Sequence, residues 1–111
     1  MADEAVQVRW ADVSPVEMLP GLNRRTLGQT DDMMVIEFRV AAGSVVPMHS
    51  HPHQQIGYVI SGEIAYQFEG KELVCKTGDS CAIPGGVEHG AEARAESVLI
   101  ECFSPPREEY R

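Results

Sequence analysis

Cysteine is scarce in this chain. Only three cysteines occur in 111 residues, at Cys75, Cys81 and Cys102. Their number is odd and none of them forms a CxxC pair, so the sequence indicates neither a disulfide framework nor a zinc ribbon. Because cysteine is among the most frequently buried residue types, we expect buried free thiols.

Basic residues and long apolar runs are also lacking. Nine Lys and Arg stand against 17 Asp and Glu, which gives a net charge of −8. Nucleic acids and anionic membrane surfaces need a basic stripe, so we expect neither as a partner. No apolar run approaches the roughly 20 residues of a membrane-spanning helix. The beginning of the chain carries acidic residues instead of the layout of a signal peptide, so a cytoplasmic location is expected.

The third absence is helical periodicity, and its place is taken by short apolar stretches between turn residues. At 111 residues the chain is expected to form one domain. Frequent turns between short strands are typical of an all-β sandwich or barrel. We predict an N-terminal arm over 1–22 with a possible strand at Gln7–Trp10, and a barrel domain over 23–111. Its strands are expected at Met33–Val40, Val45–His51, Gln55–Ile60, Glu63–Phe68, Lys71–Cys75, Ser80–Ile83, Val87–Ala93 and Ser97–Phe103.

Two features of the chain path follow from Gly and Pro. Ser61-Gly62 between two strand patterns is typical of a tight hairpin turn. Pro105-Pro106 cannot continue a central strand, so the tail 104–111 is expected to cross one end of the barrel.

Histidines supply the main candidate site. His49 and His51 are two residues apart, so on a strand both side chains point to the same face. Together with His89 they are candidate ligands of a divalent transition metal, whether Ni, Zn, Fe, Mn or Cu. His53 has the same parity, but Pro52 intervenes, so it could line the pocket entrance or lie on the surface.

Gln55 follows the histidines and is a candidate fourth ligand. An amide oxygen carries no charge, so the metal would stay a stronger Lewis acid than with glutamate. Non-haem iron oxygenases typically use two His and a carboxylate, so Gln55 favours Lewis-acid chemistry over dioxygen chemistry. The alternative is that Gln55 fills the site without binding metal.

The spacing of these residues resembles the two motifs of the cupin superfamily. Gly43, His49, His51 and Gly62 match the first motif, with Gln55 at its glutamate position. The second motif is matched by Gly78, Pro84, Gly86 and His89, with Ala93 at its asparagine position. The resemblance implies a double-stranded β-helix, also called a jelly-roll barrel, and a metal bound by His49, His51, Gln55 and His89.

A narrower resemblance is to the pectin-degradation cupins of KdgF type. It rests on His49-Ser50-His51-Pro52-His53-Gln54-Gln55 and on the ending Glu101-Cys102-Phe103-Ser104-Pro105-Pro106-Arg107. The resemblance implies that Glu101, Phe103 and Arg107 serve the reaction, with Glu101 standing where the family has aspartate. It also implies linearisation of 4,5-unsaturated uronates to the keto-acid.

The residues themselves leave alternatives open. Glu101 lies among apolar neighbours, which favours a raised pKa and acid or base chemistry, but it could instead pair with an arginine. Arg107 could hold a substrate carboxylate, or it could be a solvated tail residue or form a salt bridge with Glu108 or Glu109. The rival functions are a cupin isomerase or dioxygenase and a non-enzymatic module that binds a small anion.

Two further expectations concern packing. Gly57, Ala91 and Ala93 are small residues that would leave space beside the metal. Val98, Ile100 and Cys102 on the opposite face of the last strand predict a homodimer interface. Arg24, Arg25 and Arg39 are cationic candidates that the sequence does not assign to a place.

Overall fold

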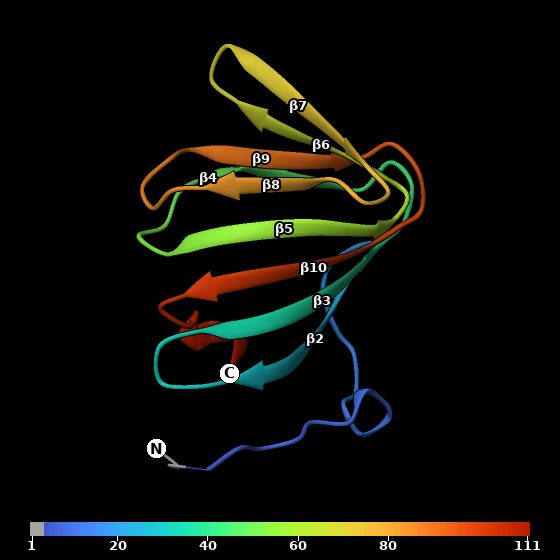
Figure 1. Ribbon diagram of the computed structural model, residues 1–111. Coiled ribbons are helices and arrows are strands. Elements are labelled where there is room, and N and C mark those ends of the chain that lie inside the picture. The colour runs from blue at the N-terminus through green and yellow to red at the C-terminus, as the bar shows by residue number, and fades with distance from the viewer. Residues whose placement is uncertain (1–3) are drawn as a thin grey trace.

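A computed structural model describes residues 4–111, which fold into two antiparallel sheets (Figure 1). The larger sheet has the order β1-β2-β3-β10-β5-β8, and the smaller has the order β4-β9-β6-β7. The strands are β1 Val16–Leu19, β2 Leu22–Gln29, β3 Met34–Val40, β4 Val45–His49, β5 Gln54–Ser61, β6 Glu63–Phe68, β7 Lys71–Lys76, β8 Ser80–Ile83, β9 His89–Ala93 and β10 Ser97–Ser104. Two short 3-10 helices, η1 Trp10–Asp12 and η2 Glu108–Tyr110, complete the part of the chain described.

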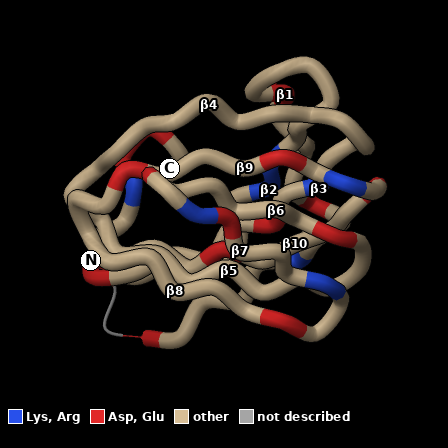
Figure 2. Tube along the Cα trace, turned by 90° about the horizontal axis from the view of Figure 1, so that it is seen from above, with Lys and Arg blue, Asp and Glu red and all other residues tan. Residues whose placement is uncertain are grey.

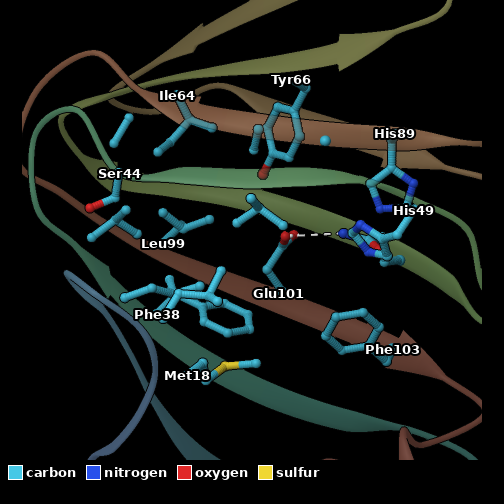
Figure 3. A pocket seen from close by; sticks show the side chains of 18 of the residues that line it. Met18, Phe38, Ser44, His49, Ile64, Tyr66, His89, Leu99, Glu101 and Phe103 are labelled. Atoms are coloured by element: carbon cyan, nitrogen blue, oxygen red, sulfur yellow. Dashed lines mark hydrogen bonds between the residues drawn. The ribbon is translucent and has the colours of Figure 1, made fainter.

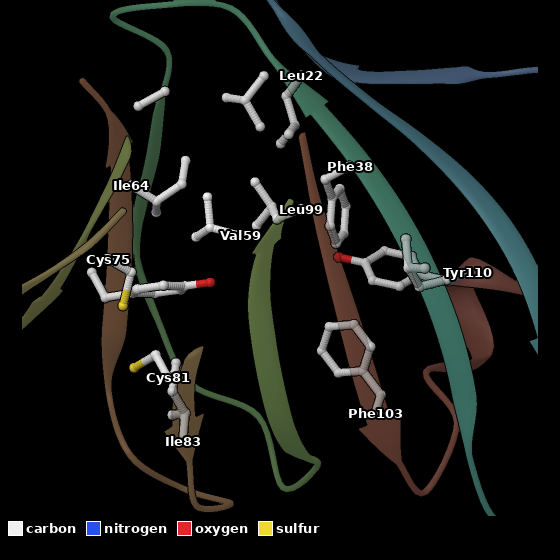
Figure 4. Packing of buried hydrophobic residues seen from close by; sticks show 14 of the residues in the cluster. Leu22, Phe38, Val59, Ile64, Cys75, Cys81, Ile83, Leu99, Phe103 and Tyr110 are labelled. Carbon is white, nitrogen blue, oxygen red and sulfur yellow. The ribbon is translucent and has the colours of Figure 1, made fainter. Parts of the chain in front are cut away.

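The prediction of an all-β fold is confirmed, and the strand pattern explains it. Along β5 and β10 buried and more exposed residues alternate, so one face of each strand turns to the interior. The eight predicted strands correspond to β3 through β10 with small shifts at their ends. The two sheets face each other and enclose the apolar core (Figure 4).

The N-terminal region differs from the prediction. Residues 7–9 are not in a strand, and Trp10 begins η1, so the possible strand Gln7–Trp10 is wrong. The sheet instead begins at β1, inside the segment predicted as an arm, which pairs with β2. The division at residue 22 stays a prediction.

Ser61-Gly62 is a corner between sheets and not a hairpin turn. β5 pairs with β10 and β8 in the larger sheet, whereas β6 pairs with β7 and β9 in the smaller sheet. The chain turns at Gly62, whose φ of 107° favours glycine. A Cβ there would lie 2.2 Å from Ser97 Oγ, so the corner also has no room for a side chain.

The N-terminal segment is attached to the outer face of the larger sheet by Trp10. Its indole Nε1 donates hydrogen bonds to both carboxylate oxygens of Glu37, at 2.9 and 3.0 Å. Arg25 lies over the Trp10 ring at 4.1 Å and pairs with Glu37, as does Arg39. Burial by itself would raise the pKa of Glu37, but the hydrogen bonds from Trp10 and the two arginines outweigh it and leave the pKa lowered.

The C-terminal tail folds back onto the barrel. Tyr110 is buried and makes edge contacts with Phe38 and Phe103. Its backbone oxygen accepts a hydrogen bond from the Thr26 hydroxyl of β2. The tail therefore closes one side of the core, and Arg107 at its start is held in a defined position.

Charge and cysteine follow the sequence. Asp and Glu are spread around the fold and outnumber Lys and Arg (Figure 2). All three cysteines are free; Cys75 and Cys81 are buried as expected, whereas Cys102 is half-buried. No helix formed by residues 4–111 is long and apolar enough to cross a membrane.

Candidate metal centre and catalytic pocket

Three histidines meet at one end of the barrel interior. His49 at the end of β4 lies opposite His89 at the start of β9 in the strand register, and His51 follows two residues after His49. One nitrogen from each ring lies within 4.8 Å of the others. The sequence prediction that these three side chains converge is therefore confirmed.

Backbone carbonyls fix the orientation of all three rings. The Nδ1 atoms of His49, His51 and His89 lie 2.8–3.0 Å from the carbonyl oxygens of Pro47, His53 and Val87, respectively. A carbonyl only accepts, so each Nδ1 carries the proton and each Nε2 keeps its lone pair. Burial, with Arg107 nearby, lowers the pKa of His51 and His89, which favours the neutral form that binds metals.

Gln55 connects the histidines to an acid. Its Oε1 lies 2.8 Å from His51 Nε2, and its Nε2 donates to Glu101 Oε1 over 3.1 Å. Gln55 is buried at the start of β5, and its strand neighbours place it next to Phe103 of β10. The amide thus turns its oxygen towards the histidines and its nitrogen towards Glu101.

The donor set fits a divalent transition metal. His51 Nε2 and Gln55 Oε1 both present lone pairs to each other at 2.8 Å, an arrangement that a cation between them would stabilise. The residues that could hold the metal are therefore His49, His51, His89 and Gln55, the set expected from the sequence.

Glu101 lies in the same interior, on β10. It is buried, and burial raises the pKa of its carboxyl to about 8, although the Tyr66 hydroxyl and the Gln55 amide oppose the shift. It makes no salt bridge among the residues described, so the alternative of an arginine pair is not found. A carboxyl with this pKa exchanges a proton near neutral pH.

Phe103 and Arg107 line the cavity that contains these groups. The cavity has a volume of about 130 Å³, and its wall includes His49, His89, Gln55, Glu101, Phe103 and Arg107. Arg107 stacks over the rings of Phe103 and Tyr110 at 5.5 and 4.6 Å, and pairs with Glu109 at 3.0 Å. Figure 3 shows Glu101 and Phe103 on the same side of the cavity, with His49 and His89 at its end.

Several secondary predictions have clear outcomes. Ala91 and Ala93 line the cavity, as expected of small residues. Gly57 instead makes room for two side chains, because a Cβ there would lie 2.2 Å from the Tyr66 hydroxyl and 2.4 Å from Glu101 Oε2. The ring of His53 lies 5.3 Å from that of His51, but His53 belongs to neither the cluster nor the cavity wall.

The three unassigned arginines lie outside the cavity. Arg25 and Arg39 pair with Glu37 on the outer face of the larger sheet. Arg24 lies 5.0 Å from the Tyr110 ring and is not part of the cavity wall. Arg107 is therefore the arginine that lines this cavity among the residues described.

Sequence reasoning missed one residue of the site, Tyr66. Tyr66 on β6 is buried and reaches Glu101 from the facing sheet (Figure 3). The parity of β6 could have indicated that Tyr66 points inwards with Ile64, but not its contact across the barrel. Glu109 of η2 pairs with Arg107, which was one of the alternatives expected for this arginine.

Known proteins share this fold and much of the sequence. The chain is 35% identical over 102 residues to the pectin degradation protein KdgF of Dickeya dadantii, which covers 89% of the chain and 93% of that protein. The structure of KdgF from a Halomonas species superposes with a TM-score of 0.91 at 29% identity, over 97% of this chain and all of that one. An RmlC-like cupin from Shewanella frigidimarina gives a TM-score of 0.90 at 30% identity, over 97% of both chains.

The family model described as a cupin domain matches residues 36–101, which include the histidine cluster, Gln55 and Glu101. The match spans more than half of the chain and both of the glycine and histidine motifs. This protein therefore belongs to the cupin domain family.

Proposed function

We propose that this protein opens 4,5-unsaturated uronate monosaccharides to the linear keto-acid in a metal-dependent reaction. The observation that carries the proposal is the Gln55 amide, which links the histidine cluster to a buried acid in one small cavity. The identity to a pectin degradation protein over most of the chain supports it.

The cavity suits a small anion. Its volume of about 130 Å³ is below the roughly 300 Å³ at which pockets for drug-sized ligands begin, which favours a monosaccharide. Arg107 would hold the substrate carboxylate through its planar guanidinium, and Phe103 would pack against the sugar ring. Because the protein is strongly acidic overall, such a local positive group is needed to bind an anion.

Glu101 would move the proton. Linearisation breaks the bond between the anomeric carbon and the ring oxygen, and a proton lost from the anomeric hydroxyl is balanced by one gained at the carbon beside the new ketone. With its pKa raised to about 8, Glu101 is mostly protonated at neutral pH and can deliver a proton. When bound by His49, His51, Gln55 and His89, a divalent metal supplies Lewis-acid polarisation of a substrate oxygen.

We also propose a homodimer formed through the outer face of the larger sheet. Val98, Ile100 and Cys102 are half-buried there, and their register neighbours Ile56 and Tyr58 are exposed. A contiguous apolar face of this kind is typical of an interface. A monomeric mass measured by light scattering at micromolar protein concentration would contradict the homodimer.

The cytoplasmic location stays a prediction.

The test of the function is an ultraviolet assay with metal-replete protein and unsaturated galacturonate, or its counterpart from alginate. We expect loss of the enol-ether absorbance faster than the spontaneous rate, and no acceleration after chelation. Arg107→Ala should raise KM roughly 10- to 100-fold, because a hydrogen bond to a charged group stabilises a complex by about that factor. Arg94→Ala, which removes an arginine outside the cavity wall, is the matched control.

The rival functions give different results in the same experiment. Oxygen uptake by the iron-loaded protein, absent with zinc, identifies a dioxygenase. Tight binding of the uronate without turnover identifies a binding module. No acceleration with any common divalent metal refutes the proposed reaction.

A further inference from the structure

Three buried polar atoms of the cavity wall have no hydrogen-bond partner within residues 4–111: the Tyr66 hydroxyl, Oε2 of Glu101 and Nε of Arg107. The first two both lie beside Gly57, and their residues are only 2% and 6% exposed. Buried polar atoms are almost always paired, because leaving one unpaired costs free energy. Finding one potential donor and one acceptor together in the same cavity therefore calls for a joint explanation.

Gly57 is the reason that these two atoms are close together. A Cβ at this position would lie 2.2 Å from the Tyr66 hydroxyl and 2.4 Å from Glu101 Oε2. Both oxygens thus occupy the space that a side chain at position 57 would fill. Gly57 lies opposite Glu101 in the register of β5 and β10, while Tyr66 arrives from β6 in the facing sheet. Three strands in two sheets therefore converge on this contact.

The other carboxylate oxygen of Glu101 is already engaged. Oε1 accepts the hydrogen bond from the Gln55 amide, whose own oxygen is directed at His51. Oε2 is consequently the oxygen left to meet a substrate. Its direction depends on what holds it, and Tyr66 is the polar side chain beside it.

We propose that Tyr66 is a positioning residue whose hydroxyl holds Oε2 of Glu101 while Gln55 holds Oε1. With this contact made, the carboxyl plane is fixed from both sides. A phenol suits this role because it donates to a carboxylate and accepts from a protonated acid. Burial raises the pKa of Tyr66 far above its ordinary value, so the hydroxyl keeps its proton.

The contact can be tested without any substrate, through a double-mutant cycle of thermal unfolding. Tyr66→Phe removes only the hydroxyl, and Glu101→Met removes both oxygens at similar length. We expect Tyr66→Phe to lower Tm by roughly 3–6 °C when Glu101 is present, and to leave Tm unchanged or raise it beside Met at position 101.

A second variant tests the role of the glycine. Gly57→Ala should lower Tm, because its new methyl group would collide with both oxygens. Adding Tyr66→Phe to Gly57→Ala should recover part of the loss, since the hydroxyl that made the 2.2 Å contact is gone. If Tyr66→Phe shifts Tm equally in the wild-type protein and in the Glu101→Met variant, the proposed contact between Tyr66 and Glu101 is refuted.

The kinetic consequence rests on the proposed function and is measured separately. Tyr66→Phe should lower kcat for the unsaturated uronate roughly tenfold, which is a fraction of the rate enhancement that a positioned acid contributes. KM should stay within about twofold of the wild-type value. A merely structural tyrosine would not separate kcat from KM in this way, so unchanged kcat overturns the positioning role. If the wild-type protein does not turn over the uronate, the proposed function fails, and the unfolding cycle still decides whether Tyr66 holds Glu101.

Discussion

Replacing Gln55 by glutamate changes one group at the centre of the site. The amide oxygen lies 2.8 Å from His51 Nε2, and the amide nitrogen donates to Glu101 Oε1 at 3.1 Å. Glutamate at this position keeps an oxygen for the histidine cluster. It loses the N–H that Glu101 needs and places a second carboxylate beside the first.

The size of the effect follows from the 3.1 Å separation. If both carboxyls were ionised, two unit charges at that distance would repel by about 5 kcal/mol at an effective dielectric constant of 20. Glu101 already holds a proton at neutral pH, and this repulsion would make that proton harder to release by between about three and four pKa units. The lost hydrogen bond from the Gln55 amide adds about 0.5–1.5 kcal/mol. We therefore expect kcat to fall by at least about a hundredfold while the histidine cluster keeps its metal.

The measurement combines the ultraviolet assay with metal stoichiometry by mass spectrometry. Gln54→Glu is the matched control, because it adds the same charge at the exposed neighbouring position. This control should retain kcat within about twofold, since its charge is screened by solvent. If Gln55→Glu turns over substrate within about threefold of the wild-type rate, the electrostatic reasoning is wrong.

Three further predictions concern other parts of the molecule. His89→Ala should abolish stoichiometric metal binding measured by calorimetry, whereas His53→Ala, outside the cluster, should retain it; metal bound equally by both variants contradicts the ligand set. Glu109→Gln should lower KM for an anionic substrate a few-fold, because Arg107 loses its exposed competitor at 3.0 Å; an unchanged KM means that this ion pair does not compete. Glu37→Gln should lower the free energy of unfolding at pH 7, and this loss should shrink as the pH falls below the ordinary glutamate pKa of about 4.3, because the lowered folded pKa makes the ionised carboxylate the stabilising form. Urea unfolding at pH 7 and pH 3 checks the last prediction, and a difference between the two proteins that is independent of pH refutes it.

The sequence predicted the middle of the fold better than its beginning. Buried residues alternate with exposed ones along β5 and mostly with half-buried ones along β10, so their pattern is visible in the sequence. β2 reads Leu-Asn-Arg-Arg-Thr-Leu-Gly-Gln, which has few of the residues that favour strands, and its place depends on pairing with β3. Gly62 illustrates a second limit, because a local turn pattern does not reveal which sheet the next strand will join.

For the site, residue spacing within the segment 49–55 predicted the metal-binding residues that this segment contributes. His49, His51 and Gln55 are close in sequence, and the connection between β4 and β5 brings them together although these strands belong to different sheets. Tyr66 and Glu101 meet across the barrel, at a gap created by Gly57 on a third strand. Such a contact depends on how the two sheets pack, which local pattern does not encode.

The central position of β10 has a consequence for how the protein folds. β10 is the last strand in sequence, yet it lies between β3 and β5 in the larger sheet. β3 can pair with β10 only after some sixty further residues have been synthesised. Pairing between strands so far apart in sequence is slow. During translation the N-terminal strands would be exposed as an open edge until β10 leaves the ribosome, which makes this the stage at which a chaperone would be most useful.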